Sequence, residues 1–125
     1  MIGKKVLVIE DNELNLKLVR TLLELAQFTV LAADNAERGI SLAREQSPDL
    51  ILMDIQLPGL DGLSATKNIL ADPQLKHIPV IAVTSFAMEG DKEKALNAGC
   101  TGYISKPIDT RKFVNEVNSF LGAAG

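Results

Sequence analysis

Acidic residues stand directly after two of the most apolar runs of this sequence, although charged side chains are rarely buried unless they are paired. Glu10 and Asp11 follow the run KVLVI, and Asp54 follows LILM. Two later apolar runs also end on polar residues, with Thr84–Ser85 after VIAV and Lys106–Pro107 after YIS. Carboxylates, a hydroxyl and an ammonium could together receive and hold a phosphoryl group, provided that the fold brings them to one place.

The elements that must position these residues are strands and helices in alternation. Continuous apolar character in the first, third and fourth runs indicates strands covered on both faces, as in a parallel sheet. The expected strands are Lys5–Ile9, Phe28–Ala33, Leu50–Met53, Val80–Val83 and Tyr103–Ser105. Helical spacing predicts helices at Leu14–Ala26, Ala36–Glu45, Leu63–Leu70, Met88–Ala98 and Thr110–Leu121. We therefore predict an α/β fold of the (βα)5 type, with helices on both faces of a five-stranded parallel sheet of order 2-1-3-4-5.

The ends and faces of the helices carry their own signals. Asp11 or Asn12 is the expected N-cap of the first helix, Asp109 that of the last, and Gly99 the residue that ends the fourth. On the first helix we expect the core-facing stripe to consist of Leu14, Leu18, Leu22 and Leu25. A second apolar stripe broadens this face and either joins the core or in part forms a partner surface; of the two, we expect partial exposure: Leu16, Val19 and Leu23.

Composition excludes several classes of protein. The 125 residues suit one domain, residues 1–125, with 13 basic against 16 acidic residues and a net charge of −3. Lys and Arg form no long run, so we expect no direct nucleic-acid binding. Cys100 is the lone cysteine, which fits a small buried apolar residue in a protein of the reducing cytoplasm. Charges interrupt the first apolar run, so we expect no signal peptide, and no apolar stretch approaches the length of a membrane span.

The carboxyl ends of parallel strands meet at one edge of the sheet, where ligands of such folds bind. With strands 1 and 3 adjacent, Glu10, Asp11 and Asp54 come together there. Carboxylates about 5 Å apart repel by roughly 3 kcal/mol per pair at an effective dielectric constant of about 20. Raised pKa values, the Lys106 ammonium or a divalent cation could offset that repulsion. Oxygen ligands with few protein contacts favour Mg²⁺, and Asp54 would then be a nucleophile held on a rigid strand.

Two other functions compete with a phosphoryl acceptor. Phosphatases of the haloacid dehalogenase type also use an aspartate at a strand end, but as D-x-D, and Gln56 stands here in place of the second acid. A flavin or nucleotide site would need a loop rich in Gly, Ser or Thr after the first strand, whereas EDNELN is acidic. His77 could in principle carry a phosphoryl group, but a loop histidine is expected to be a solvated surface residue.

Four motifs together resemble the receiver domain of two-component response regulators, a member of the CheY-like, flavodoxin-like superfamily. They are VLVIEDN, PDLILMDIQLPGLDG, PVIAVTSFA and GYISKPI, in the expected order and spacing, and the resemblance covers essentially the whole chain. EDNELN, PDLILMDIQLP and FAM-x-GD further resemble stand-alone receivers of the DivK type. The resemblance implies a phosphorylation-dependent signalling module rather than an enzyme, with weak phosphotransfer and slow autodephosphorylation of its own.

The resemblance also implies roles for the residues of the acidic edge. Asp54 matches the aspartate that a histidine kinase or a histidine phosphotransfer protein phosphorylates in a Mg²⁺-dependent reaction. Asp11 matches a direct metal ligand, and Glu10 matches an acid that acts partly through water. Gln56 would contribute its backbone carbonyl to the metal, and Lys106 would be the cationic partner of the phosphoryl group.

Switching and partner binding are implied in the same way. Thr84 matches the hydroxyl that follows the phosphoryl group, Tyr103 matches the aromatic residue that changes rotamer, and Lys106–Pro107 matches a cis peptide bond. The downstream target would bind the face made by the fourth helix, the fifth strand and the fifth helix, since no output domain is expected. The phosphodonor would approach over the rim of the acidic edge, where we expect three contact residues: Asn15, Leu18 and Ile108.

Overall fold

The strands of the protein form one parallel sheet in the order β2-β1-β3-β4-β5, which confirms the predicted topology. The computed structural model describes residues 4–57, 61–84 and 89–124. The strands are β1 (Lys5–Ile9), β2 (Thr29–Ala33), β3 (Leu50–Asp54), β4 (Val80–Thr84) and β5 (Gly102–Ser105). The helices are α1 (Glu13–Leu25), α2 (Ala36–Gln46), α3 (Gly62–Ala71), α4 (Glu89–Asn97) and α5 (Phe113–Ala124). The expected start of the fourth helix at Met88 lies outside the described residues.

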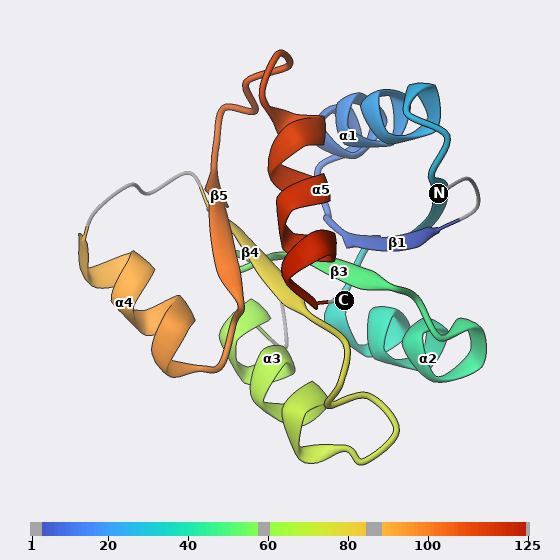
Figure 1. Ribbon diagram of the computed structural model, residues 1–125. Coiled ribbons are helices and arrows are strands. Elements are labelled where there is room, and N and C mark those ends of the chain that lie inside the picture. Colours follow the sequence, from blue (N-terminus) through green and yellow to red (C-terminus); the bar gives the residue numbers. More distant parts are fainter. Residues whose placement is uncertain (1–3, 58–60, 85–88, 125) are drawn as a thin grey trace.

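The sheet separates two hydrophobic cores, one on each face (Figure 1). Alternate residues of each strand point to opposite faces, so every strand contributes to both cores. On one face, α1 and α5 lie side by side and bury Leu23, Phe113 and Val117 against the sheet. On the other face, Ile40 of α2, Ile69 of α3 and Ala95 of α4 are buried. Covering on both faces explains why the central strands are continuously apolar.

The prediction for the faces of α1 was wrong. Val19 and Leu23 belong to the core, whereas Leu14 and Leu25 are 79% and 77% exposed. Leu18 is also exposed, and Leu16 is half-buried against the core. Both stripes are rich in leucine and lie on roughly opposite sides of the helix, so the spacing alone does not show which stripe the sheet and α5 cover.

Helix ends follow local hydrogen bonding. Asn12 is the N-cap of α1, because its side chain accepts the N–H of Asn15 at 3.0 Å. Gly99 follows α4 with φ of +104°, a conformation that glycine adopts without steric cost. Its N–H donates to the Leu96 carbonyl, and the next N–H, from Cys100, donates to the Ala95 carbonyl. These paired bonds close the last turn of α4.

The last helix begins later than predicted, at Phe113 rather than Thr110. The Asp109 carboxylate accepts the N–H of Arg111 at 3.0 Å, and the Asp109 carbonyl accepts the N–H groups of Lys112 and Phe113. Asp109 thus closes a separate turn before the helix, and α5 then continues to Ala124, beyond the expected end at Leu121. Among residues 4–57, 61–84 and 89–124, no helix has both the length and the apolar character needed to cross a bilayer.

Candidate metal centre

Three carboxylates meet where β1 and β3 end. The two strands are neighbours, with Ile9 in register with Met53, so Glu10 and Asp54 follow at the same edge of the sheet. Carboxylate oxygens of Glu10, Asp11 and Asp54 lie within 4.8 Å of one another. Glu10 and Asp54 are only 5% and 3% exposed, whereas Asp11 is exposed to solvent. The cluster therefore has a buried floor and one open side.

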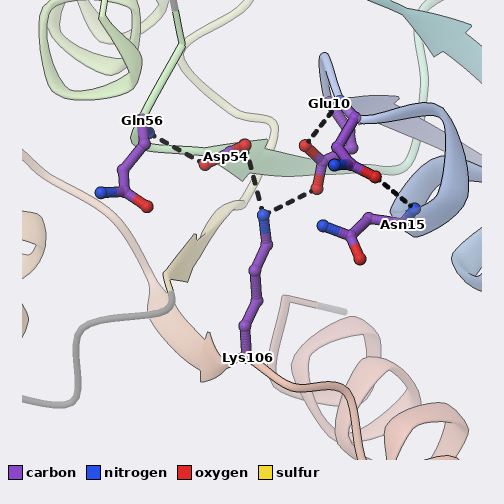
Figure 2. Close-up of polar contacts among 6 residues, drawn as sticks. Glu10, Asn15, Asp54, Gln56 and Lys106 are labelled. Carbon is purple, nitrogen blue, oxygen red and sulfur yellow. Dashed lines mark hydrogen bonds and ion pairs between the residues drawn. The ribbon is translucent and has the colours of Figure 1, made fainter.

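Lys106 places a single ammonium between the two buried acids. Its Nζ atom lies 2.8 Å from Oε1 of Glu10 and 3.3 Å from Oδ2 of Asp54. Dashed lines in Figure 2 mark both contacts. The Lys106 backbone N–H donates to the Thr84 carbonyl at 2.7 Å, which ties the residue after β5 to the end of β4. The Lys106–Pro107 peptide bond that follows is cis. Two neighbouring strands thus hold the cation against carboxylates from two others.

Backbone N–H groups orient the remaining carboxylate oxygens. Oε2 of Glu10 accepts the N–H of Asn12 at 3.2 Å, and Oδ1 of Asp54 accepts the N–H of Gln56 at 2.9 Å. Both oxygens of each buried acid therefore have a donor. Among the residues that the structure describes, no buried side-chain nitrogen or oxygen lacks a hydrogen-bond partner. The buried part of the site is preorganised, because moving either acid would break two polar contacts.

The pKa values reflect the crowding of like charges. Burial and the neighbouring Asp54 carboxyl raise the pKa of Glu10 from its ordinary 4.5 to about 7, although Lys106 and the Asn12 N–H act in the opposite direction. Burial by itself would lower the pKa of Lys106, but its hydrogen bond to Glu10 and the charges of both acids outweigh burial and raise that pKa. Three acids against one ammonium leave an excess of negative charge.

The donor set fits a small hard divalent cation. Carboxylate oxygens are the ligands that Mg²⁺ prefers, and it keeps several waters when a protein offers only a few ligands. Asp11 opens to solvent while Glu10 and Asp54 form the floor, so a partly hydrated cation has room on the exposed side. Gln56 follows Asp54 at the same edge and contributes the N–H described above. Sequence analysis did not predict that the backbone N–H groups of Asn12 and Gln56 donate to the two buried acids, because their direction depends on the folded backbone.

The two predicted switch residues share one face of the sheet. Ala82 is in register with Tyr103 and Thr84 with Ser105, so Thr84 and Tyr103 project to the same side of their strands. Thr84 is buried, whereas Tyr103 is half-buried and packs against the core on that face. Tyr103 also lines a surface pocket of about 360 Å³ between β5 and the start of α5.

Two of the three predicted contact residues lie on α1, and the third, Ile108, lies in the segment after β5. Asn15 stands in the first turn of α1, near Glu10 (Figure 2), and is half-buried. Leu18 is exposed one turn further along α1, and Ile108 is half-buried against the core that α1 covers. His77 is exposed next to the amino end of β4, at the opposite end of the sheet from the acids. Cys100 is buried, which confirms its expected role as a small core residue.

Known proteins resemble this chain over nearly its whole length. Residues 6–118 match the response regulator receiver domain. The chain is 51% identical over 121 residues to the polar-differentiation response regulator DivK of Brucella anthropi, covering 97% of this chain and 98% of that protein. It is 50% identical to DivK of Brucella ovis over the same length and with the same coverage.

Solved structures agree with the sequence relatives. The receiver domain of sensor histidine kinase PA1611 from Pseudomonas aeruginosa PAO1, with a magnesium ion coordinated in its active site cleft, has a TM-score of 0.89 at 33% identity, over 96% of this chain and 98% of that chain. Chemotaxis response regulator CheY4 of Vibrio cholerae has a TM-score of 0.88 at 22% identity, over 94% and 98%, which shows the fold alone. The chain belongs to the response regulator receiver domain family of two-component signalling.

Proposed function

We propose that this receiver domain is a phosphorylation switch in which Asp54 accepts a phosphoryl group from a phosphohistidine. The donor would be a histidine kinase or a histidine phosphotransfer protein. The observation that carries the proposal is the position of Asp54: a buried carboxylate at a strand end, with Lys106 on one oxygen and two further acids within 4.8 Å. A carboxylate without that setting would be a poor phosphoryl acceptor, because the incoming group is itself negatively charged.

The site residues would divide the work of the transfer. An oxygen of Asp54 attacks phosphorus, the bond from phosphorus to the donor nitrogen breaks, and an acyl phosphate forms on Asp54. Lys106 already lies against Asp54 and would follow the negative charge onto the phosphoryl oxygens. Gln56 would hold the other Asp54 oxygen through its N–H, which limits rotation of the carboxylate. The same residues hold the acid in place before the donor arrives.

Mg²⁺ is the proposed cofactor, held by Asp11, Asp54 and the Gln56 backbone carbonyl, with Glu10 acting partly through water. When bound, it would supply positive charge to the phosphoryl oxygens. The different settings of the two neighbouring acids support this division. Lys106 lies nearer to Glu10, at 2.8 Å, than to Asp54, at 3.3 Å, so Glu10 is the acid that the ammonium pairs most closely, whereas Asp11 is exposed to solvent. Asp11 is therefore better placed for direct ligation than Glu10.

The output of the switch would pass through Thr84 and Tyr103. A phosphoryl group on Asp54 would attract the Thr84 hydroxyl, and Tyr103, on the same side of the adjacent strand, would turn inward behind it. The surface of α4, β5 and α5 would then change and bind a downstream target differently. The pocket of about 360 Å³ beside Tyr103 supports this, because it gives the ring a space to leave or enter.

The surface for the phosphodonor would be the exposed part of α1 next to the acidic edge, with Asn15, Leu18 and Ile108 as contacts. The exposed leucines of α1 support an apolar contact there, because large apolar side chains that gather on a surface mark interaction sites.

The reducing cytoplasm is the expected compartment, and a receiver domain over residues 1–125 is the expected organisation. By its similarity to DivK, the chain would signal through protein partners.

Labelling with acetyl phosphate tests the proposal directly. The wild-type chain should gain the mass of one phosphoryl group in MgCl₂ and none in EDTA, as measured by intact mass spectrometry. Asp54→Asn removes the nucleophile while keeping the shape of the side chain, so it should gain none in either buffer. Labelling that persists in Asp54→Asn, or that needs no divalent cation, would contradict the assignment.

A further inference from the structure

The first residue of α3 lies against the backbone that carries the candidate phosphoacceptor. Gly62 begins α3 and is buried. A Cβ atom at this position would lie 2.5 Å from the carbonyl oxygen of Asp54 and 2.5 Å from the Cα of Ile55, closer than Cβ atoms approach other groups in proteins. Only glycine therefore lets α3 approach the end of β3 this closely.

The backbone on the β3 side has little freedom to move away. The Ile55 N–H donates to the carbonyl of Val83 on the neighbouring strand at 3.3 Å, and the Gln56 N–H donates to the carboxylate of Asp54 at 2.9 Å. Shifting the Asp54–Ile55 peptide would disturb both bonds. The bond from Gln56 orients the Asp54 carboxylate, so a shift of this peptide would move the oxygen that reacts.

The helix on the other side is held as well. Asp61 is the N-cap of α3, and its carboxylate accepts the N–H of Ser64 at 2.8 Å. The buried hydroxyl of Thr66 donates to the Gly62 carbonyl at 2.8 Å within the same turn. A Cβ at residue 62 would therefore push a capped, bonded turn against a bonded strand end. The segment between them leads from Asp54 to α3 and includes Gln56, whose carbonyl is a proposed metal ligand.

We propose that Gly62 is a positioning residue for the phosphoacceptor: it sets the distance between α3 and the Asp54–Ile55 peptide, and through it the placement of the Asp54 carboxylate and the Gln56 carbonyl. The inference rests on the proposed function, because it assigns Gly62 a part in metal binding and phosphoryl uptake. Gly62 does not touch the phosphoryl group. It acts through the backbone that holds the groups that do.

Gly102, a glycine of the sheet, provides a matched control. A Cβ at Gly102, in β5, would lie 2.4 Å from Cε1 of the Phe120 ring, so its clash is as severe in distance. It meets the end of a half-buried side chain rather than backbone, and the ring can turn aside. Gly102→Ala should therefore disturb packing between β5 and α5 while leaving the acidic edge unchanged.

The test compares Gly62→Ala, Gly102→Ala and wild type as full chains. Mg²⁺ affinity is measured by amide NMR titration with MgCl₂, and phosphoryl uptake by acetyl phosphate labelling at saturating Mg²⁺. We expect Gly62→Ala to bind Mg²⁺ about tenfold more weakly and to label about a hundredfold more slowly. Gly102→Ala should match wild type in both measurements. The Ile55 and Gln56 amide signals should shift in metal-free Gly62→Ala and stay in place in Gly102→Ala.

Wild-type affinity and labelling in a folded Gly62→Ala would overturn the inference, and so would equal losses in both variants. If Gly62→Ala does not fold, Thr66→Val decides the question. That substitution removes the bond to the Gly62 carbonyl at nearly constant volume, and it should weaken Mg²⁺ binding measurably, by about threefold. Unchanged Mg²⁺ affinity in Thr66→Val would then overturn the inference. Failure of wild type to label is a different result, because it contradicts the proposed function itself.

Discussion

Replacing Lys106 by methionine should destabilise the metal-free protein, because it removes the ammonium that pairs two buried acids. Nζ lies 2.8 Å from Glu10 and 3.3 Å from Asp54, and the Lys106 side chain is only 14% exposed. Methionine keeps much of the apolar stem but carries no charge. The variant therefore leaves Glu10 and Asp54 within 4.8 Å of each other with no cation between them.

The size of the effect follows from these distances. At an effective dielectric constant of about 20, the two attractions are worth roughly 6 and 5 kcal/mol before any desolvation cost. Removing one partner of a buried ion pair typically costs 3–5 kcal/mol net, and the partial exposure of Lys106 places it near the lower end, at about 3 kcal/mol. For a chain of this length, that corresponds to a melting temperature lower by about 10 °C.

The loss should depend on pH, in a direction set by Glu10. Its pKa in the folded protein is raised from 4.5 to about 7. The stability that protonated Glu10 contributes is therefore fully present below pH 4.5 and is lost as the pH rises through 7. Without Lys106, which lowers that pKa, the Glu10 pKa should rise further. At pH 6 Glu10 is largely protonated, so losing the ammonium destabilises the folded variant less. At pH 8 the folded variant must either bury an unpaired Glu10 carboxylate or bind a proton, and both cost free energy. The difference between variant and wild type should therefore grow from pH 6 to pH 8.

Thermal unfolding followed by far-UV circular dichroism measures the effect in EDTA and in MgCl₂. Lys112→Met is the matched control, because it makes the same substitution at an exposed lysine. Mg²⁺ should narrow the gap between Lys106→Met and wild type, since the cation takes over the role of the ammonium. Equal melting temperatures in EDTA at pH 8, with no dependence on pH, would refute the view that Lys106 compensates the charge of the buried acids.

Three further predictions concern the proposed roles of single residues. Asp11→Ala should weaken Mg²⁺ binding more than Glu10→Ala in an NMR titration, because the exposed acid is the proposed direct ligand; the reverse ranking would exchange their roles. Thr84→Ala should still accept phosphate from acetyl phosphate, but beryllofluoride should shift its amide signals at α4 and β5 much less than in wild type. Equal shifts there would remove Thr84 from the switch. Leu18→Asp should slow transfer from a cognate kinase but leave acetyl phosphate labelling intact, whereas Leu25→Asp, at the far end of α1, should slow neither. Equal loss in both assays for Leu18→Asp would indicate damage to the fold or the site.

The topology and the place of the site could be read from the sequence for a simple physical reason. Alternation of apolar runs and helical patterns leaves few arrangements, because crossovers between parallel strands are right-handed and both faces of the sheet must be covered. All carboxyl ends of parallel strands then share one edge. Any polar residue that directly follows a strand reaches that edge, which is why Glu10, Asp54 and Lys106 could be grouped before their contacts were known.

Helix ends were predicted correctly at some positions and wrongly at others. Asn12, one of the two predicted candidates, caps the start of α1, and Gly99 follows the end of α4 as predicted, because the cap and the positive φ are properties of a few adjacent residues. Asp109 can accept the N–H groups of the residues that follow it either as a helix N-cap or within a separate turn. The structure has the turn, and α5 begins at Phe113, whose ring is buried in the core.

Only the tertiary structure decided which side of α1 is buried and which groups touch in the site. The two leucine stripes of α1 are equivalent in spacing, and contact with the sheet and α5 alone selects Val19 and Leu23 for the core. Lys106, which follows β5, meets Glu10 after β1 and Asp54 in β3, and Gly62 at the start of α3 meets the Asp54 backbone. Such contacts depend on how separate elements pack together, so hydrophobic periodicity and helix-cap residues in the sequence do not predict them. The sequence by itself determined the sheet and the edge where the acids gather, because both follow from local pattern and chain connectivity.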